Sequence, residues 1–285
     1  MSTRTKVFQK KIWEFLGPQT KSRTASFAYK ENRREFPWRE TTDPYKILVS
    51  EVMLQQTQTS RVLPKYQLFF ERFPTIESLA KASNEDVLRV WSGLGYNRRA
   101  LYLKKIAGIL AREHNNKLPL DPKILKTFPG IGQNTAGAIY VFSKNVPYVF
   151  IETNIRRVFI HEFFKNRYSI LDKEILKLIE KTLDRKNPRE WYYALMDYGA
   201  LLAKTEVNPN RKSKHYIKQS RFKGSSRQVR GQILKILLVR KKVSMKELEE
   251  QFGNKEYFKK ALGQLKKEGF IEINGKNPQT LKIRY

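Results

Sequence analysis

A five-residue stretch, Phe128-Pro129-Gly130-Ile131-Gly132, separates two segments of helical periodicity and restricts how the chain can turn between them. Apolar residues recur at helical spacing before it, at 123–127, and after it, at 133–143. Proline cannot continue a helix, whereas the two glycines permit a left-handed backbone and leave no Cβ in the way. The stretch therefore predicts a tight hairpin between two helices.

Successive N–H groups in such a hairpin can converge on an anion, or its carbonyl groups on a cation. The helix that starts near Gln133 adds the positive end of its dipole. A hairpin of this kind can hold a DNA backbone without reading its sequence. An ordinary corner between two helices is the alternative, and the glycines by themselves do not separate the two interpretations.

The charge of the chain favours a polyanionic partner. Lys and Arg number 57 and Asp and Glu number 27, for a formal net charge of +30. Such an excess is typical of nucleic-acid-binding proteins, although a solvated lysine-rich surface would also produce it. The chain has no Cys and three His, which excludes disulfides and iron–sulfur clusters and leaves few ligands for zinc. Catalysis must then rest on carboxylates, amides and hydroxyls.

The N-terminus is basic, but the apolar run of a signal peptide does not follow it, and no stretch is long enough to span a bilayer. We therefore expect a cytoplasmic protein without a membrane partner, located at the nucleoid if its source is prokaryotic. Nothing in the sequence indicates an obligate assembly, so a monomer is expected. The length of 285 residues leaves room for two domains and a small third.

Helical periodicity dominates residues 7–205, so the expected fold class is all-α. Asp43 followed by Pro44 predicts the N-cap and first residue of a helix with one buried stripe. Further helical patterns lie at 63–73, 76–81, 85–92, 99–112, 123–127, 133–143, 154–164, 173–183 and 190–203.

Residues 204–230 are strongly basic and lack an apolar pattern. We interpret them as a linker that follows a phosphate backbone, a disordered tether being the alternative. Beyond it, three helices followed by a β-hairpin predict a winged helix, whose third helix commonly enters the major groove of DNA, although many such modules bind only proteins. The predicted elements are helices at 226–240, 245–252 (capped by Ser244) and 255–268, and strands at 270–274 and 281–285 joined across 275–278.

Several segments within residues 37–202 resemble, in order and spacing, the helix-hairpin-helix DNA glycosylase superfamily, and most closely its MutY-type adenine glycosylases. The Glu-Val-Met-Leu-Gln-Gln-Thr-Gln block at 51–58 favours the adenine branch over the pyrimidine branch. The other matching segments are Pro37-Trp38-Arg39, Thr42-Asp43-Pro44-Tyr45, Gly93-Leu94-Gly95-Tyr96, Phe128-Pro129-Gly130-Ile131-Gly132 with Thr135-Ala136-Gly137-Ala138-Ile139, and Asn154-Ile155-Arg156-Arg157-Val158.

The resemblance implies an all-α helix-hairpin-helix glycosylase fold. It places a six-helix barrel at 41–145 and a flanking helical domain at 1–40 and 146–222, to which the sequence adds the winged helix at 226–285. It also implies that a nucleotide of mismatched or damaged double-stranded DNA is flipped out of the duplex and its N-glycosidic bond hydrolysed.

Three residues carry the implied catalysis. Glu51 matches the general acid that protonates adenine, which needs a carboxyl of raised pKa, and by helical phase it lies about 120° from the buried stripe, free to face a cleft. Glu152 stands where the family has an Asp that stabilises the positive sugar, so the charge is kept but an extra methylene must be absorbed. We expect a working substitute, a weakened enzyme being the alternative. Asn154 matches a residue that supports this carboxylate.

Other matches concern DNA. Gln55, Gln56 and Tyr96 match positions that fill or flank the gap left in the base stack. Superfamily members that also cut the strand carry a Schiff-base Lys where this chain has Asn134, so a glycosylase without lyase activity is predicted. The expected substrate- and DNA-binding residues are Arg39, Gln55, Gln56, Tyr96, Gly130, Gly132, Gln133, Asn134 and Thr135.

Two features of the family are missing. The Asp197-Tyr198-Gly199-Ala200 segment is present, but Ala203 and the Lys-rich 211–218 stretch stand where cluster-binding cysteines would follow. No iron–sulfur cluster, other cofactor or metal is therefore expected, with a monovalent cation at the 128–132 hairpin left open. The usual C-terminal domain of nucleotide-hydrolase type, which inspects 8-oxoguanine, is replaced by the winged helix.

The expected function is base excision repair, namely hydrolytic removal of adenine mispaired with 8-oxoguanine or G, without strand cleavage. One alternative keeps the fold but removes thymine or uracil opposite G. The other is an inactive DNA-binding or regulatory protein in which Glu152 marks a lost site.

Overall fold

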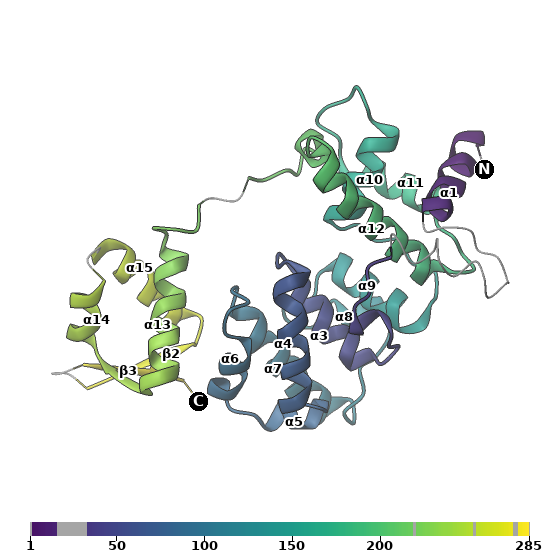
Figure 1. Ribbon diagram of the computed structural model, residues 1–285. Helices are drawn as coiled ribbons and strands as arrows, with labels where there is room; N and C mark the ends of the chain where they lie inside the picture. Colours follow the sequence, from purple (N-terminus) through teal and green to yellow (C-terminus); the bar gives the residue numbers. More distant parts are fainter. Residues whose placement is uncertain (1, 16–32, 219–220, 253–254, 276–278, 285) are drawn as a thin grey trace. The chain divides into compact units, whose positions relative to one another are not determined.

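The computed structural model describes residues 2–15, 33–218, 221–252, 255–275 and 279–284 (Figure 1). Helices dominate it, and the sheet in the described part is small, which confirms the predicted fold class. The chain forms two compact units, Met1–Glu51 with Pro119–Lys218, and Val52–Leu118 with Gln219–Tyr285. The finer division into barrel, flanking domain and C-terminal domain stays a prediction.

The first unit is built around a long, largely buried helix, α12. Trp191 and Tyr192 on this helix are fully buried, and α12 packs against α1, α9 and α10, with α10 lying beside it in Figure 1. Aromatic rings fill the contacts, such as Phe142 stacked on Tyr193 at 4.6 Å. The helices of this unit are α1 (Thr3–Phe15), η2 (Pro37–Arg39), the start of α3 (Pro44–Leu54), α8 (Pro122–Leu125), α9 (Gln133–Lys144), α10 (Thr153–Phe163), α11 (Asp172–Thr182), α12 (Pro188–Thr205) and η3 (Pro209–Lys212).

In the second unit, the helices between 59 and 113 surround an apolar core that includes Phe69 and Trp91. Local sequence fixes their starts, because Thr75 and Ser78 form a reciprocal capping box and Ser83 caps the next helix. The helices are α4 (Thr59–Arg72), α5 (Ile76–Lys81), α6 (Asn84–Trp91) and α7 (Arg98–Glu113). Their bounds lie within two residues of the predicted ones, except that α4 begins four residues earlier.

The C-terminal part of this unit contains three helices and a three-stranded antiparallel sheet of order β1-β3-β2. The predicted helices and hairpin strands are observed, whereas the short strand β1 beside β3 was not predicted. Ser244 occupies the N-cap of α14, but its side chain does not cap the helix. Residues 276–278 of the predicted turn and residue 285 of the predicted second strand lie outside the described residues. The elements are α13 (Ser226–Arg240), β1 (Lys242–Ser244), α14 (Met245–Gln251), α15 (Lys255–Lys267), β2 (Ile271–Asn274) and β3 (Thr280–Ile283).

The predicted linker at 204–230 is wrong over its first part. Helix α12 continues to Thr205, and the short helix η3 then packs against α10. The backbone of Lys214 donates to the Ile170 carbonyl at 2.9 Å, which closes a bridge between Ile170 and Ser213. Backbone and polar contacts hold this segment in place, so its sequence has little apolar periodicity. The apolar pattern therefore did not predict that the segment is folded. Residues 219–220 of the expected linker lie outside the described part of the chain.

None of the helices in the described ranges is both long enough and apolar enough to cross a membrane.

Candidate active site

Glu51 is a half-buried residue near the C-terminal end of α3. Asp43 caps this helix as predicted, accepting the backbone N–H of Tyr45 at 2.8 Å. The expectation of a single buried stripe is wrong, since apolar residues are buried on almost every side of the helix, from Ile47 to Met53. Glu51 thus lies on a helix that is buried on most of its sides.

Glu152 is the N-cap of α10. Its carboxylate accepts the backbone N–H groups of Asn154 at 2.9 Å and Ile155 at 3.0 Å, and the Asn154 side-chain amide donates to it at 3.3 Å. These donors and the positive end of the helix dipole stabilise a negative charge. Asn154 thus supports the carboxylate, and the longer Glu side chain is accommodated by folding back onto the helix start.

The two carboxyl groups influence each other electrostatically. Burial, and next the charge of Glu152, raise the pKa of Glu51 to about 8, while the Arg39 guanidinium opposes this rise. Burial also raises the pKa of Glu152, but the N–H groups of Asn154 and Ile155 and the Arg157 charge act in the opposite direction. At neutral pH Glu51 is therefore mostly protonated, while the donors around Glu152 oppose the rise in the pKa of that carboxyl that its burial causes.

Gly199 on α12 holds the start of α10 in place. A Cβ at this position would lie 2.7 Å from the Asn154 Cβ and closer still to its carbonyl oxygen, so only glycine allows the approach. Arg157 closes the same contact by donating to the Asn154 amide oxygen at 2.7 Å and to the Gly199 carbonyl at 2.6 Å. The glycine of the Asp197-Tyr198-Gly199-Ala200 segment therefore orients the Glu152 carboxylate.

A second close approach positions the chain before Glu152. A Cβ at Gly137 of α9 would lie only 2.8 Å from the Phe150 Cβ. Because glycine has no Cβ, the segment leading to Glu152 can pack directly against the helix. At the start of α9, the Asn134 side-chain oxygen accepts the backbone N–H of Ile151 at 3.2 Å. Asn134 thus links the start of α9 to the segment that bears Glu152.

Arg39 lies in a buried ion pair with Asp197. Its two terminal nitrogens donate to the two carboxylate oxygens at 2.8 and 2.9 Å, and Arg34 donates to the same carboxylate at 2.5 Å. The Arg39 side chain is 3% exposed and lies over the Tyr193 ring. This position accounts for its effect on Glu51 but leaves little of the guanidinium for DNA, so DNA contact by Arg39 stays a prediction that its burial disfavours.

The segment that replaces the cysteine-rich region supports the same helix start. Asn210, a residue 6% exposed, donates through its side-chain amide to the Thr153 carbonyl at 3.0 Å. A bidentate pair between Arg156 and Asp172, at 2.8 and 2.6 Å, holds α11 to α10. Asp172 is the first residue of α11, directly after the N-cap Leu171. Direct contacts thus stabilise the surroundings of Glu152.

The predicted hairpin between α8 and α9 is observed. Gly130 has a φ of +79°, which favours glycine, and Gly132 is the N-cap of α9 with open space around its missing Cβ. The side chains of Gln133 and Asn134 at the helix start are exposed, Thr135 is half-buried, and Gln133 donates to the Tyr148 hydroxyl at 2.6 Å. The hairpin offers helix N–H groups to an anion.

In the second unit, the residues predicted to occupy the base stack lie on two turns. Gln56 and Tyr96 have φ of +54° and +46°, left-handed values that are uncommon for non-glycine residues and cluster at functional sites. Tyr96 is 43% exposed. Gln55 precedes Gln56 at the end of α3 and is half-buried.

Arg99 joins these two turns and was not predicted from the sequence. Its guanidinium donates to the carbonyls of Val52, Met53 and Gln55 at 2.7–2.8 Å, and to Thr57 Oγ1 and the Gly95 carbonyl at 2.9 and 3.1 Å. Burial lowers its pKa to about 10. A charged residue on the apolar stripe of α7, four residues before Leu103, was the signal that could have identified it.

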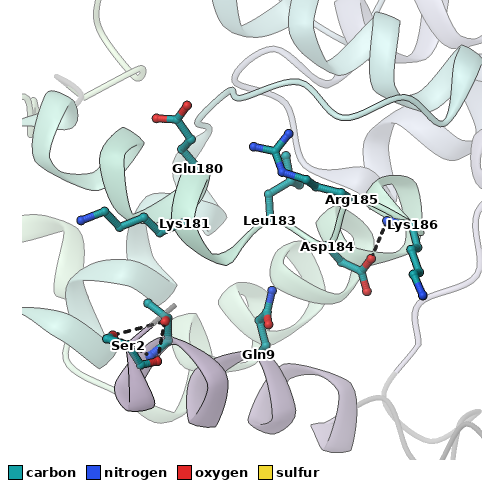
Figure 2. A pocket seen from close by; sticks show the side chains of 9 residues that line it. Ser2, Gln9, Glu180, Lys181, Leu183, Asp184, Arg185 and Lys186 are labelled. Carbon is teal, nitrogen blue, oxygen red and sulfur yellow. Dashed lines mark hydrogen bonds between the residues drawn. The ribbon is translucent and has the colours of Figure 1, made fainter.

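A cavity elsewhere in the first unit is not part of this arrangement. It is lined by side chains of α1, of the end of α11 and of the segment that follows α11, including Gln9, Lys181 and Asp184 (Figure 2). None of the predicted site residues lines it. Among the described residues, no three His, Asp or Glu side chains gather as metal ligands would. The predicted absence of a cofactor stays a prediction.

Several known proteins are similar to this chain in sequence. The profile of the HhH-GPD superfamily of base excision DNA repair proteins matches residues 49–184. The chain is 40% identical over 174 residues to an adenine DNA glycosylase of Buchnera aphidicola subsp. Baizongia pistaciae, covering 60% of this chain and 49% of that protein. It is 34% identical over 248 residues to an adenine DNA glycosylase of Mycobacterium tuberculosis, covering 78% and 80%.

Among solved structures, a thermostable thymine-DNA glycosylase aligns with a TM-score of 0.59 and 25% identity, covering 70% of this chain and 88% of that one. Endonuclease III in a trapped covalent complex with DNA aligns with a TM-score of 0.56 at 17% identity, which bears on the fold alone. The chain thus spans about half of one adenine glycosylase and most of another. It belongs to the HhH-GPD superfamily and, within it, to the adenine DNA glycosylase family.

Proposed function

We propose that the protein is a DNA glycosylase that hydrolyses the N-glycosidic bond of mispaired adenine in double-stranded DNA, opposite 8-oxoguanine or G. The observation that carries the proposal is the pairing of Glu51, with a pKa of about 8, and Glu152 at the N-cap of α10. Two carboxyl groups whose surroundings separate their protonation states are what acid-assisted cleavage of a glycosidic bond requires.

Each carboxyl group has a distinct part in this chemistry. The protonated Glu51 donates its proton to the departing adenine, which then leaves as a neutral base. The ionised Glu152 stabilises the positive charge that develops on the sugar as the bond breaks. Water completes the hydrolysis and leaves an abasic site.

Strand cleavage is not part of the proposed reaction. Cleavage through a Schiff base needs an amine nucleophile, and the corresponding side chain here is the amide of Asn134, which already accepts the N–H of Ile151. The purified protein should therefore give no covalent adduct with abasic DNA under borohydride, whereas heat and alkali should cleave its product.

The proposed partner is double-stranded DNA, bound by a monomer. Support comes from the formal charge of +30 and from the hairpin of Phe128 to Gly132, whose helix N–H groups suit a backbone phosphate. The carbonyl groups of the same hairpin could order a monovalent cation. The mismatch preference rests on the similarity to adenine glycosylases, and poor pairing would itself lower the cost of flipping the base.

Removal of thymine or uracil opposite G is the second candidate, favoured by the aligned thymine-DNA glycosylase structure. A panel of duplexes containing A:8-oxoguanine, A:G, T:G and U:G, with released bases identified by mass, separates the two candidates. Adenine from the first two duplexes supports the proposal, and thymine or uracil alone would replace it with the second candidate. Duplex binding without release of any base would favour the inactive DNA-binding protein.

A further inference from the structure

The C-terminal module, which comprises the elements from α13 to β3, packs against helix α6 of the same unit. The side-chain amide of Asn84, the first residue of α6, donates to the Arg284 carbonyl at 2.8 Å. Further along α6, the Arg89 guanidinium donates to the Leu238 carbonyl at 2.8 Å. Helices α6 and α13 are also in contact. These contacts fix the module on α6.

Glu268, directly after α15, links the module to the first residue of α7. Its carboxylate accepts hydrogen bonds from the Arg98 guanidinium and from both terminal nitrogens of Arg230 on α13. The Glu268 side chain is 13% exposed, whereas the Arg98 side chain is 51% exposed. Arg230 therefore orients the carboxylate within the module, and the carboxylate in turn binds an exposed cation of α7.

The start of α7 lacks the local stabilisation that is common at helix N-termini. Within the described ranges, the Asn97 side chain makes no capping hydrogen bond, and the first turn of the helix contains no acid. Arg98 and Arg99 occupy this turn instead, although the positive end of a helix dipole disfavours cations. Arg99 is bound by carbonyls at the end of α3. Glu268 thus supplies the negative charge that an acid in the first turn would otherwise provide.

The turn before α7 bears Tyr96, which is predicted to occupy the base stack. Gly93, Gly95 and Tyr96 all have positive φ. A left-handed tyrosine is unfavourable by itself and persists only where surrounding contacts hold it. Arg99 binds the turn at the Gly95 carbonyl, and Arg98, two residues after Tyr96, is held by the module. The backbone on the C-terminal side of Tyr96 is therefore anchored twice.

We propose that the C-terminal module positions the Tyr96 turn for base extrusion, with Glu268 acting through Arg98. The ion pair stabilises the start of α7 and so keeps the Tyr96 ring in place while a nucleotide leaves the stack. Glu268 is thus a positioning residue. Its role rests on the proposed function, because extrusion is the step that precedes hydrolysis of the glycosidic bond.

Glu268→Gln tests the proposal through base extrusion. The duplex carries 2-aminopurine opposite 8-oxoguanine, and the fluorescence of 2-aminopurine rises when this base leaves the stack. The equilibrium constant for extrusion at saturating protein should fall about three- to fivefold, because a partly exposed ion pair is lost. Glu272→Gln is the matched control, since Glu272 pairs with Lys282 across two strands of the same module and its replacement removes the same charge. The control should leave extrusion unchanged.

Arg98→Gln removes the other half of the ion pair. It leaves the contact between Glu268 and Arg230 intact, so it separates the effect on α7 from any effect on the fold of the module. Each single variant should reduce extrusion to a similar extent, and the double variant should show no larger loss than either. Melting curves of the full chain, recorded for all variants, should not follow the order of the extrusion losses.

Equal losses that do not add, together with a normal control, support the proposal. Normal extrusion by Arg98→Gln would overturn it, as would losses that add in the double variant or an equal loss in Glu272→Gln. If extrusion depends on Glu268 but no duplex releases adenine, the proposed function fails while this inference stands. If the variants extrude the base normally and adenine is released, this inference fails while the proposed function stands.

Discussion

The carboxylate of Glu152 accepts the backbone N–H of Asn154 at 2.9 Å, so one side chain both starts α10 and supplies the anion of the proposed site. An amide in its place could still accept that N–H but would carry no charge. The contributions of Glu152 to folding and to chemistry can therefore be separated by substitution.

Glu152→Gln should fold with a loss of stability of about 1 kcal/mol or less, because a cap acceptor remains. Base release should fall about 100-fold or more, because the developing sugar charge loses its counter-charge. Glu152→Asp keeps the charge and should remain active. Single-turnover assays with melting curves check both. A Gln variant within tenfold of the unaltered protein would contradict the role given to this charge.

Glu51 should make activity depend on pH. Because burial and the Glu152 charge raise its pKa to about 8, the acid form predominates below that pH and disappears above it. The value of kcat/KM should then fall about tenfold per pH unit above pH 8. Glu51→Gln should reduce release by a factor on the order of 100 to 10,000 and retain duplex binding. A profile that stays level up to pH 10 would argue against Glu51 as the acid.

The same raised pKa should appear in folding stability. Glu51 binds its proton more tightly in the folded chain than in the unfolded one, where its pKa is near 4.5. Its contribution to stability is therefore complete below about pH 4.5 and is lost as the pH rises towards 8. Glu51→Gln removes this dependence, so the melting temperature of the variant relative to the unaltered protein should be higher at pH 9 than at pH 5. The opposite order would mean that the Glu51 pKa is not raised.

Gly199→Ala should disturb the start of α10, since the new methyl group would overlap the backbone of Asn154. Overpacking of this kind costs about 1–3 kcal/mol, and the displaced Glu152 should slow base release further. Melting curves and single-turnover rates measure the two effects. Leu201→Ala, at a 40% exposed position of the same helix, serves as the control and should change neither. A fully stable and active Gly199→Ala variant would show that α10 does not depend on this approach.

Arg99→Lys should loosen the turns that bear Gln56 and Tyr96, because an ammonium cannot reproduce the fork of a guanidinium. We expect a loss of about 1–3 kcal/mol of stability and a smaller fluorescence rise from 2-aminopurine at the target position, which reports base extrusion. A bulged, unpaired target should partly restore release. Arg112→Lys, exposed at the other end of α7, is the control. Normal extrusion by Arg99→Lys would remove Arg99 from the positioning of these turns.

The sequence was most informative where local rules or dense motifs apply. Asp43 and Pro44 correctly marked the start of α3, and the glycine-rich hairpin was found between the two helices that it joins. The carboxyl groups of Glu51 and Glu152 were predicted to act together, and the structure brings their charges within reach of each other. These features depend on short-range chemistry or on several segments in register.

What the sequence did not reveal depends on contacts distant along the chain. The side chain of Asn210 reaches Thr153, and Ser213 pairs with Ile170, yet nothing in the apolar pattern of 204–218 indicates a folded segment. Arg39 was expected at a DNA surface, because sequence cannot show that Asp197, 158 residues away, neutralises it. Burial of polar groups is decided by their partners, and partners appear only in three dimensions.

Arg99 binds carbonyl groups of both turns in the second unit, at Gln55 on one side and Gly95 on the other. The two turns therefore open as one cooperative unit, and their amide protons should exchange with solvent at a common rate. Substitution during evolution is restricted in the same way, because a change in the shape of one turn must preserve the hydrogen bonds that Arg99 donates to the other turn.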